Sequence, residues 1–541
     1  MMKTLLILMP LTVFFLISCQ KKTGQESTTR KPNFIVIVLD DLDFDEVNFY
    51  NLDYSPCYYS ARQNKIKNAV KSAWKKTGFF MPNIDKLAGN GAVFTRFYAN
   101  SSVCTPVRYA LLTGRQAYES PFISMQTPNG EPAFIRWNSF ISPDERTIVD
   151  DLHDRNYVAA FIGKWHNGAN FKPILIPYSP EDFNDSLKYQ RIRKDYAYIQ
   201  KFLTDSLRWD YADRIFYDNP AILNLEWMTE GVIRFLDSYK DKPFFLYLPL
   251  PFPHAQYYDF KNWDPLITPA GILEKAPESG HSYPEAKRKN KLHFLPDAFS
   301  MATYIDDFIG VILNKLKEYG IDENTMIIFT SDQQTRGKYT CYETCRVPTF
   351  IYYPPLIKPK TKIHELCLIT DIYPTVLSLI DKKEVSIPGS DSRSLIALLS
   401  PKKNSGKIPW RQEIYLEISY SKAIVTKDYK YIANRPPLTA MKKMKADEQR
   451  SKNSGTRRKI GWDGMVWGWN GLVYNLDLDF PAYFDADQLF DLNRDVFEQR
   501  NLAYLPEYQN VVNEMKLRLK NKMSNYPFKF GEFSEEKRTL P

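Results

Sequence analysis

Four short apolar runs constrain the fold of this chain more than any other feature of its sequence. Residues 33–39, Asn-Phe-Ile-Val-Ile-Val-Leu, form an unbroken β-branched run, which is typical of a strand buried on both faces. Comparable runs occupy residues 157–162, 243–248 and 325–331, with helical patterns between them. Because strands that alternate with helices favour a parallel arrangement, we expect an α/β fold: a mostly parallel central sheet covered by helices on both faces.

Polar side chains follow each run, at the edge where open α/β sheets place their sites. In the order of the runs, they are Asp40 and Asp41, Lys164 and His166, His254 behind a proline-stiffened loop at 249–253, and Asp332 and Gln333. Adjacent carboxylates after a buried strand are costly unless a cation or hydrogen bonds hold them. They therefore indicate oxygen ligands for a hard divalent metal, with a solvated turn as the alternative.

The second of these clusters favours an anion. Lys164 and His166 are two residues apart on an extended segment, so both side chains point the same way and can face one negatively charged group. A lone lysine or histidine is usually surface chemistry, but this pair directly follows a core strand.

A further stretch, residues 101–115, is built to hold negative charge. Pro106 stands where a helix opens, and Gly114 stands where it stops. Cys104 then lies at the positive end of that helix, and Arg108 can reach the same spot from one turn along. The alternative is a buried free thiol beside a capped helix, which is common in proteins.

The order Cys-x-Pro-x-Arg, followed by Leu-Leu-Thr-Gly-Arg, resembles the signature of the sulfatase family. Gly-Lys-x-His at 163–166 and the first Asp-Asp pair are similar to other elements of that family, and the resemblance covers roughly residues 33–503. It implies an alkaline-phosphatase-like α/β fold. We expect a catalytic domain at 33–399 and a smaller C-terminal α+β subdomain with an antiparallel sheet at 400–541, joined by a Lys/Pro/Gly-rich linker.

The resemblance also implies two chemical groups that the sequence does not itself encode. In the family, a separate maturation enzyme oxidises the cysteine, here Cys104, to formylglycine, whose hydrated aldehyde is the nucleophile. The metal ligands would be residue 104 together with Asp40, Asp41, Asp332 and Gln333. Gln333 departs from the family, where asparagine or histidine is more usual. Because calcium tolerates irregular shells of amide and carboxylate oxygens, we expect Ca²⁺ in preference to Mg²⁺.

The remaining site residues take their roles from the same resemblance. Arg108 and the metal would bind one hydroxyl of the hydrated formylglycine, while Lys164 and Lys338 neutralise the sulfate oxygens. His254 would protonate the departing alcohol, and His166 would take a proton from the second hydroxyl to expel sulfate. Around Lys338, the residues Thr344 and Cys345 replace the glycines that commonly precede the next arginine.

Composition limits the classes of substrate that we expect. The net charge is +9, but the lysines are scattered and no nucleic-acid motif accompanies them, so we expect an anionic substrate and no nucleic acid. An aromatic content of 15% suits a protein that stacks sugar rings, and we expect a sulfated carbohydrate. Two alternatives remain open: a phosphate mono- or diester hydrolase of the same superfamily, and a non-catalytic lipoprotein that binds sulfated glycans.

The N-terminus predicts export. Residues 1–18 have the charged start and short apolar run of a signal peptide, and Leu-Ile-Ser-Cys at 16–19 is similar to a bacterial lipobox. We expect a lipid on Cys19, a flexible tether at 19–32 and an exported lipoprotein, periplasmic or at the cell surface, anchored in the outer membrane. An ordinary secretory signal or short anchor is the alternative. In that compartment disulfides can form, and the pairing of the four remaining cysteines stays open: Cys57, Cys341, Cys345 and Cys367.

Two basic stretches carry weaker predictions. Residues 53–79 are lysine-rich and poorly patterned, and they indicate either an insertion that walls the substrate pocket or a solvated loop. Residues 442–459 are also basic, and we expect a solvated loop there.

Overall fold

The computed structural model describes residues 30–52, 78–254, 263–295, 299–334, 338, 345–400, 409–454, 459–460, 466–467 and 482–533. The predicted signal peptide, Cys19, almost all of the 53–79 stretch, Cys57 and Cys341 lie outside these residues. Among the helices that the structure describes, each is too short or too polar to traverse a lipid bilayer.

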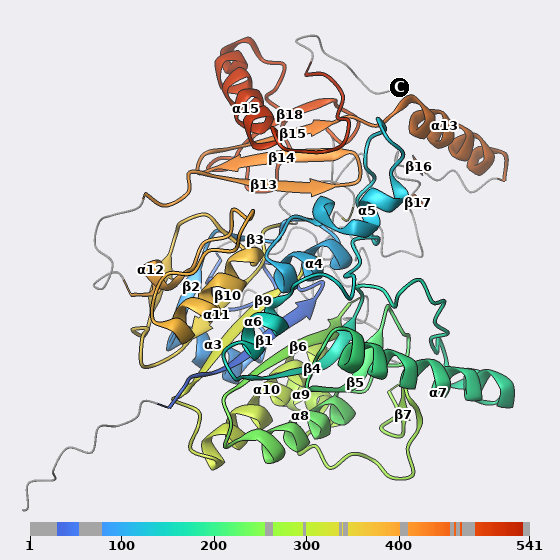
Figure 1. Cartoon of the computed structure of the whole chain (residues 1–541), viewed down its shortest axis with the longest axis vertical. Helices are drawn as coiled ribbons and strands as arrows, with labels where there is room; N and C mark the ends of the chain where they lie inside the picture. Colours follow the sequence, from blue (N-terminus) through green and yellow to red (C-terminus); the bar gives the residue numbers. More distant parts are fainter. Residues whose placement is uncertain are drawn as a thin grey trace, which may run out of the picture.

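An eight-stranded sheet forms the centre of the molecule (Figure 1). Its order is β11 (Thr361–Ile363), β2 (Ala92–Phe94), β10 (Thr349–Tyr352), β9 (Thr325–Ser331), β1 (Asn33–Asp40), β6 (Phe244–Pro253), β4 (Val158–Trp165) and β5 (Tyr211–Tyr217). β10 runs antiparallel to both of its neighbours, and the other pairs are parallel. The predicted α/β fold with a mostly parallel sheet is thus confirmed.

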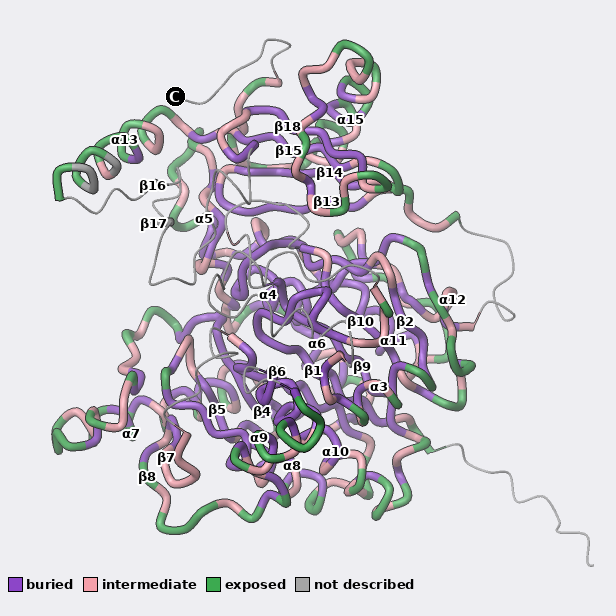
Figure 2. The backbone as a smooth tube through the Cα atoms, turned by 180° about the vertical axis from the view of Figure 1, so that it is seen from behind, coloured by how far each residue is buried: buried purple, intermediate pink, exposed green. Residues whose placement is uncertain are grey.

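The two faces of this sheet bury separate cores. In β1, Phe34, Val36 and Val38 belong to one apolar cluster, whereas Ile35, Ile37 and Leu39 belong to the other, as strand alternation requires. The first face is covered by α4 (Cys104–Thr113), α6 (Ile148–His153), α11 (Ile372–Asp381) and α12 (Ile396–Leu399). The second is covered by α3 (Pro82–Gly89), α8 (Leu225–Tyr239), α9 (Tyr283–Leu292) and α10 (Ser300–Glu318). Figure 2 shows buried backbone concentrated along these central strands.

A smaller antiparallel sheet stands above the first, as predicted for the C-terminal region (Figure 1). It consists of β13 (Glu413–Ile418), β14 (Ser421–Thr426), β15 (Tyr429–Asn434) and β18 (Asp487–Asp491), and α15 (Gln509–Lys522) packs on one face. Its other face packs against Tyr98 and Val103, and the amide of Glu417 donates to the carbonyl of Asn100 at 2.9 Å. The small sheet therefore holds the segment that leads into Cys104.

The remaining elements are short or peripheral. They are β3 (Phe97–Tyr98), α5 (Pro121–Gln126), α7 (Ser186–Lys201), β7 (Ile267–Thr268), β8 (Gly271–Ile272), β12 (Cys367–Leu368), α13 (Leu438–Asn453), β16 (Lys459–Ile460) and β17 (Val466–Trp467), with short 3₁₀ turns and a π-helical turn (Phe202–Ser206) between them.

Two predictions of loops are wrong. The proline-rich segment 249–253 is the end of β6, where the pairing with β1 continues to Pro253 but the pairing with β4 ends at Tyr247. Prolines at alternate positions have their missing amide donors on one side of the strand, so a strand that loses one neighbour can accept them. The basic stretch 442–459 is largely α13, because Ala, Met, Lys, Glu and Gln are strong helix formers.

Candidate active site

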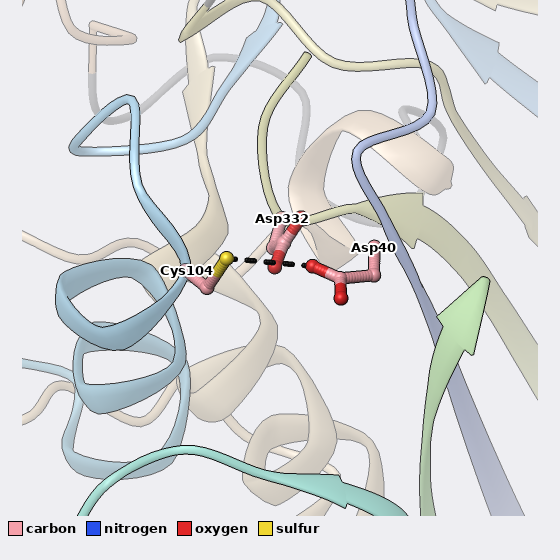
Figure 3. Close-up of side chains that lie close together, drawn as sticks. All are labelled: Asp40, Cys104 and Asp332. Carbon is pink, nitrogen blue, oxygen red and sulfur yellow. Dashed lines mark hydrogen bonds between the residues drawn. The ribbon is translucent and has the colours of Figure 1, made fainter. Parts of the chain in front are cut away.

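The predicted site residues converge at the carboxyl edge of the central sheet. Asp40 ends β1, Asp332 and Gln333 follow β9, and all three are buried. Helix α4 begins at Cys104, two residues before the predicted start, and Gly114 closes it with a left-handed φ of 70°. Cys104 thus points from the helix N-terminus towards the two strand ends (Figure 3). Its Sγ lies 3.4 Å from Asp40 Oδ1, and one ligand atom from each of Asp40, Cys104 and Asp332 falls within 4.8 Å of the others.

Three cations neutralise these carboxylates. Lys164 Nζ donates to Asp40 Oδ2 at 2.6 Å, and Arg108 Nη2 donates to Asp332 Oδ2 at 2.7 Å. Lys338 Nζ donates to Asp41 Oδ2 at 2.6 Å. Burial alone would raise the pKa of Asp40, but the neighbouring cations, Lys164 foremost, hold it well below its usual range.

The thiol of Cys104 is a poor nucleophile in this setting. Burial, and then the negative charge of Asp40, raise its pKa far above that of an ordinary thiol. Only the thiolate attacks or binds metal strongly, so an unmodified Cys104 would remain protonated and unreactive at neutral pH.

The donor set fits a hard divalent cation. Burial and repulsion from Asp40 and Asp41 outweigh the attraction of Arg108 and raise the pKa of Asp332 to about 7. The neighbouring cations therefore do not fully neutralise the negative charge of these carboxylates. Among the described residues, Gln333 Oε1 is buried without a hydrogen-bond partner, while its Nε2 donates to Asp41 and lies 3.3 Å from Cys104 Sγ. Carboxylates and an unsatisfied amide oxygen are the ligands that Ca²⁺ and Mg²⁺ prefer.

Backbone geometry supports the same conclusion. Asp41 adopts a left-handed φ of 65°, which is uncommon for a residue with a side chain and is often found at functional sites. Its amide donates to Asp332 Oδ1 at 3.1 Å, which couples the end of β1 to the end of β9. The local strain therefore serves to bring the acidic residues together.

The two predicted histidines contact different carboxylates. His254 Nε2 is 3.6 Å from Asp41 Oδ2, and burial together with Lys338 lowers its pKa to about 4. His166 Nε2 is 2.8 Å from Asp218 Oδ1, and burial followed by Lys164 lowers its pKa despite that carboxylate. Within the described part of the chain, His166 Nδ1 is buried without a partner.

Sequence reasoning missed two residues that follow β5. Asn219 Oδ1 accepts from Lys164 Nζ at 2.6 Å, and Asp218 contacts His166. Together they hold the two side chains that the Gly-Lys-x-His element presents. Asp213 and Arg214 interrupt the apolar residues of 211–217, so this strand lacked the continuous apolar run that marked its neighbours.

Comparison with known proteins gives a consistent result. The family model described as "Sulfatase" matches residues 32–382. An N-acetylgalactosamine-6-O-sulfatase of Bacteroides thetaiotaomicron is 24% identical over 518 residues, covering 80% of this chain and 88% of that protein. An ulvan-active sulfatase of Formosa agariphila is 22% identical over 536 residues, covering 95% and 86%.

Solved structures share the fold. One was determined in complex with its substrate, D-glucosamine-2-N,6-O-disulfate; it aligns with a TM-score of 0.53 at 18% identity, covering 92% of this chain and 98% of its own. A Bacteroides thetaiotaomicron protein of glycosaminoglycan metabolism aligns with a TM-score of 0.55 at 20% identity, covering 92% and 100%.

Proposed function

Because this chain belongs to the sulfatase family, we propose that it releases inorganic sulfate from a sulfated carbohydrate. One observation carries the proposal: the buried Arg108 and Lys164, together with the half-buried Lys338, pair with the carboxylates that gather beside residue 104 at the N-terminus of α4. A helix N-terminus with cations at hydrogen-bonding distance is suited to a sulfate group. Relatives named for N-acetylgalactosamine 6-sulfate and for ulvan support a carbohydrate as the substrate.

Residue 104 is proposed to act as formylglycine, because the raised pKa of the Cys104 thiol prevents formation of the nucleophilic thiolate at neutral pH. When formed, that group supplies a hydroxyl oxygen in place of the unreactive thiol. The Cys-Thr-Pro-Val-Arg run that resembles the family signature supports the modification.

A divalent metal, proposed to be Ca²⁺, would be held by Asp40, Asp41, Asp332 and Gln333. Bound there, it supplies positive charge that lowers the pKa of a neighbouring hydroxyl and stabilises sulfate oxygens. The unsatisfied Gln333 Oε1 supports its inclusion in the ligand set.

The side chains of this protein then have distinct tasks. Lys164 and Lys338 neutralise sulfate oxygens, and Arg108 orients the side chain of residue 104. His254 protonates the leaving oxygen; although burial holds its pKa near 4, a bound sulfate ester places negative charge beside the imidazole and raises that pKa. The protonated form therefore accumulates when substrate is bound.

His166 is the proposed base. Its Nε2 faces Asp218, so the proton resides on that nitrogen and the lone pair of Nδ1 remains available. The lowered pKa keeps the ring neutral at pH 7, as a base requires.

The proposal is tested by making the protein together with a formylglycine-generating enzyme. Peptide mass spectrometry should find an aldehyde in place of the thiol at residue 104. Inorganic sulfate should be released from a panel of sulfated saccharides of defined linkage, and aryl sulfate should be cleaved faster than aryl phosphate. Faster cleavage of the phosphate would favour the phosphoesterase alternative, and an active enzyme with an unmodified thiol would contradict the mechanism.

We also propose that Cys19 carries a lipid that anchors the exported protein in the outer membrane. The Leu-Ile-Ser-Cys sequence at 16–19 supports this. The Cys19→Ala protein should move from the membrane fraction to the soluble fraction, whereas a wild-type protein that is already unlipidated would refute the proposal.

A further inference from the structure

A cavity of about 600 Å³, separate from the catalytic cluster, lies between the central sheet and the small sheet. Its lining includes Arg96 after β2, Arg346 before β10, His364 after β11 and Lys427 from the β14–β15 turn. Since β2 and β11 run parallel to β1 while β10 runs antiparallel, all three central-sheet contributions come from the carboxyl edge. The catalytic cluster lies on this same edge.

The cavity is cationic without internal compensation. In the part of the chain that the structure describes, Arg96, Arg346 and Lys427 form no ion pair with a carboxylate. The acidic residue that lines the cavity, Glu498, is buried and paired with Lys430 Nζ at 2.5 Å. Three uncompensated cations around one hollow create a positive potential that an anion would relieve.

Local contacts fix the orientation of Arg346. Arg346 Nε donates to the Thr95 carbonyl at 3.0 Å, and its guanidinium lies 3.8 Å from the centre of the Phe44 ring. Its main-chain carbonyl accepts from Gln334 Nε2 at 2.7 Å. Because Gln334 directly follows the metal-site residue Gln333, the cavity and the catalytic centre share one continuous segment of structure.

We propose that this cavity binds a second anionic group, a sulfate or carboxylate, of the same glycan whose ester is cleaved at residue 104. The inference rests on the proposed function and specifies which class of sulfated carbohydrate the enzyme would take. In the sheet, β2, which precedes Arg96, lies two strand spacings from β9 and three from β1, or about 10–14 Å from the strand ends that carry the catalytic cluster. One monosaccharide cannot span that separation, so the preferred ligand is an oligosaccharide with at least two anionic groups. Planar guanidinium groups suit both sulfate and carboxylate.

The test separates binding from catalysis. Binding of a heparin-derived hexasaccharide, a densely anionic probe, is measured by calorimetry on the Cys104→Ala protein, which needs no turnover. When Arg96→Gln/Lys427→Gln is added to the Cys104→Ala protein, its affinity for the hexasaccharide should fall about tenfold or more. A Lys442→Gln/Lys443→Gln control on the exposed helix α13 removes the same charge elsewhere and should bind as before. Equal affinity in the test and control proteins would overturn the proposal.

A kinetic experiment provides the second readout. In the otherwise native enzyme, Arg96→Gln/Lys427→Gln should raise KM for a cleavable sulfated oligosaccharide and leave hydrolysis of a small aryl sulfate unchanged. A loss that is equal on both substrates would mean that these residues act on the fold, and would overturn the subsite. Absence of sulfate release from every substrate, with the difference in hexasaccharide binding intact, would count against the proposed function and not against an anion site.

Discussion

Charged side chains are buried in two regions of this molecule, and they are paired differently in each. In the small sheet, Lys422 Nζ lies 2.9 Å from Glu417 Oε2, and Lys430 pairs with Glu498. Glu417 also accepts hydrogen bonds from the Tyr415 hydroxyl and the Tyr118 amide. Lys422 and Lys430 therefore each pair with a different carboxylate, and these pairs connect elements of structure.

At the catalytic edge the pairing is incomplete. Asp40 is shared between Lys164 and Arg108. Among the described residues, several buried polar atoms have no hydrogen-bond partner: Arg108 Nε and Nη1, His166 Nδ1 and Gln333 Oε1. Leaving such atoms unsatisfied costs free energy, which a bound ligand would recover. The charged groups at the catalytic edge therefore keep unused hydrogen-bonding capacity that a ligand could take up, whereas Lys422 and Glu417 bind one another.

The Cys104→Ala variant gives the strongest test that the catalytic edge serves activity and not stability. Sulfate release should fall by about 10⁴-fold or more, because removal of a nucleophile eliminates the reaction path. The free energy of unfolding in urea should change by only about 1 kcal/mol, since few atoms are lost. Substantial residual activity would mean that residue 104 is not the nucleophile.

Glu417→Gln should have the converse effect. It leaves Lys422 buried without a countercharge, and the protein should lose about 3–5 kcal/mol of unfolding free energy. The rate per folded molecule should stay unchanged. In the Glu417→Gln/Lys422→Met double variant, both charges are gone and much of the stability should return; failure to recover would show that the pair itself is not the cause.

Asp218→Asn examines the contact that orients His166. We expect kcat to fall about 10–100-fold with little change in KM or stability, as is usual for a residue that positions another. Because Asp218 raises the pKa of His166, its loss lowers that pKa further, and the acid limb of the kcat profile should move to lower pH. An unshifted profile would indicate that His166 is not the base.

The smallest expected effect concerns metal binding. Gln333→Leu removes the unsatisfied oxygen at nearly constant size and should weaken calcium affinity about tenfold, with sulfate release weakened in parallel. Calcium-dependent protection against thermal unfolding provides the measurement. Gln333→Asn should retain part of both effects, and unchanged affinity in the leucine variant would remove Gln333 from the ligand set.

Sequence reasoning was strongest where local signals agreed with the fold. The run at 325–331 has the predicted bounds in β9, and the run at 33–39 ends one residue before β1 does. Those strands are apolar or alternate regularly, and the polar residues after them had a distinctive chemistry. The edge strand β5 lacked an apolar run, so Asp218 and Asn219 went unnoticed although they contact His166 and Lys164.

Other features depend on three-dimensional contacts. Residues 92–94 and 97–98 are close in sequence, but β2 joins the central sheet whereas β3 pairs with β12. The distance between Gln333 and Cys104 likewise arises only when β9 and α4 meet. The cavity at Arg96 and Lys427 joins residues from both sheets, and no local pattern signals it.

Helix α4 has every residue from Cys104 to Thr113 buried. Because Cys104 is only 1% exposed, a maturation enzyme cannot reach its thiol in the folded protein unless this part of the structure opens. Under the proposed maturation, conversion therefore competes in time with folding: a molecule that folds first retains its thiol permanently. The fraction of active protein would then depend on how long the nascent chain stays unfolded, and slower folding would increase the yield.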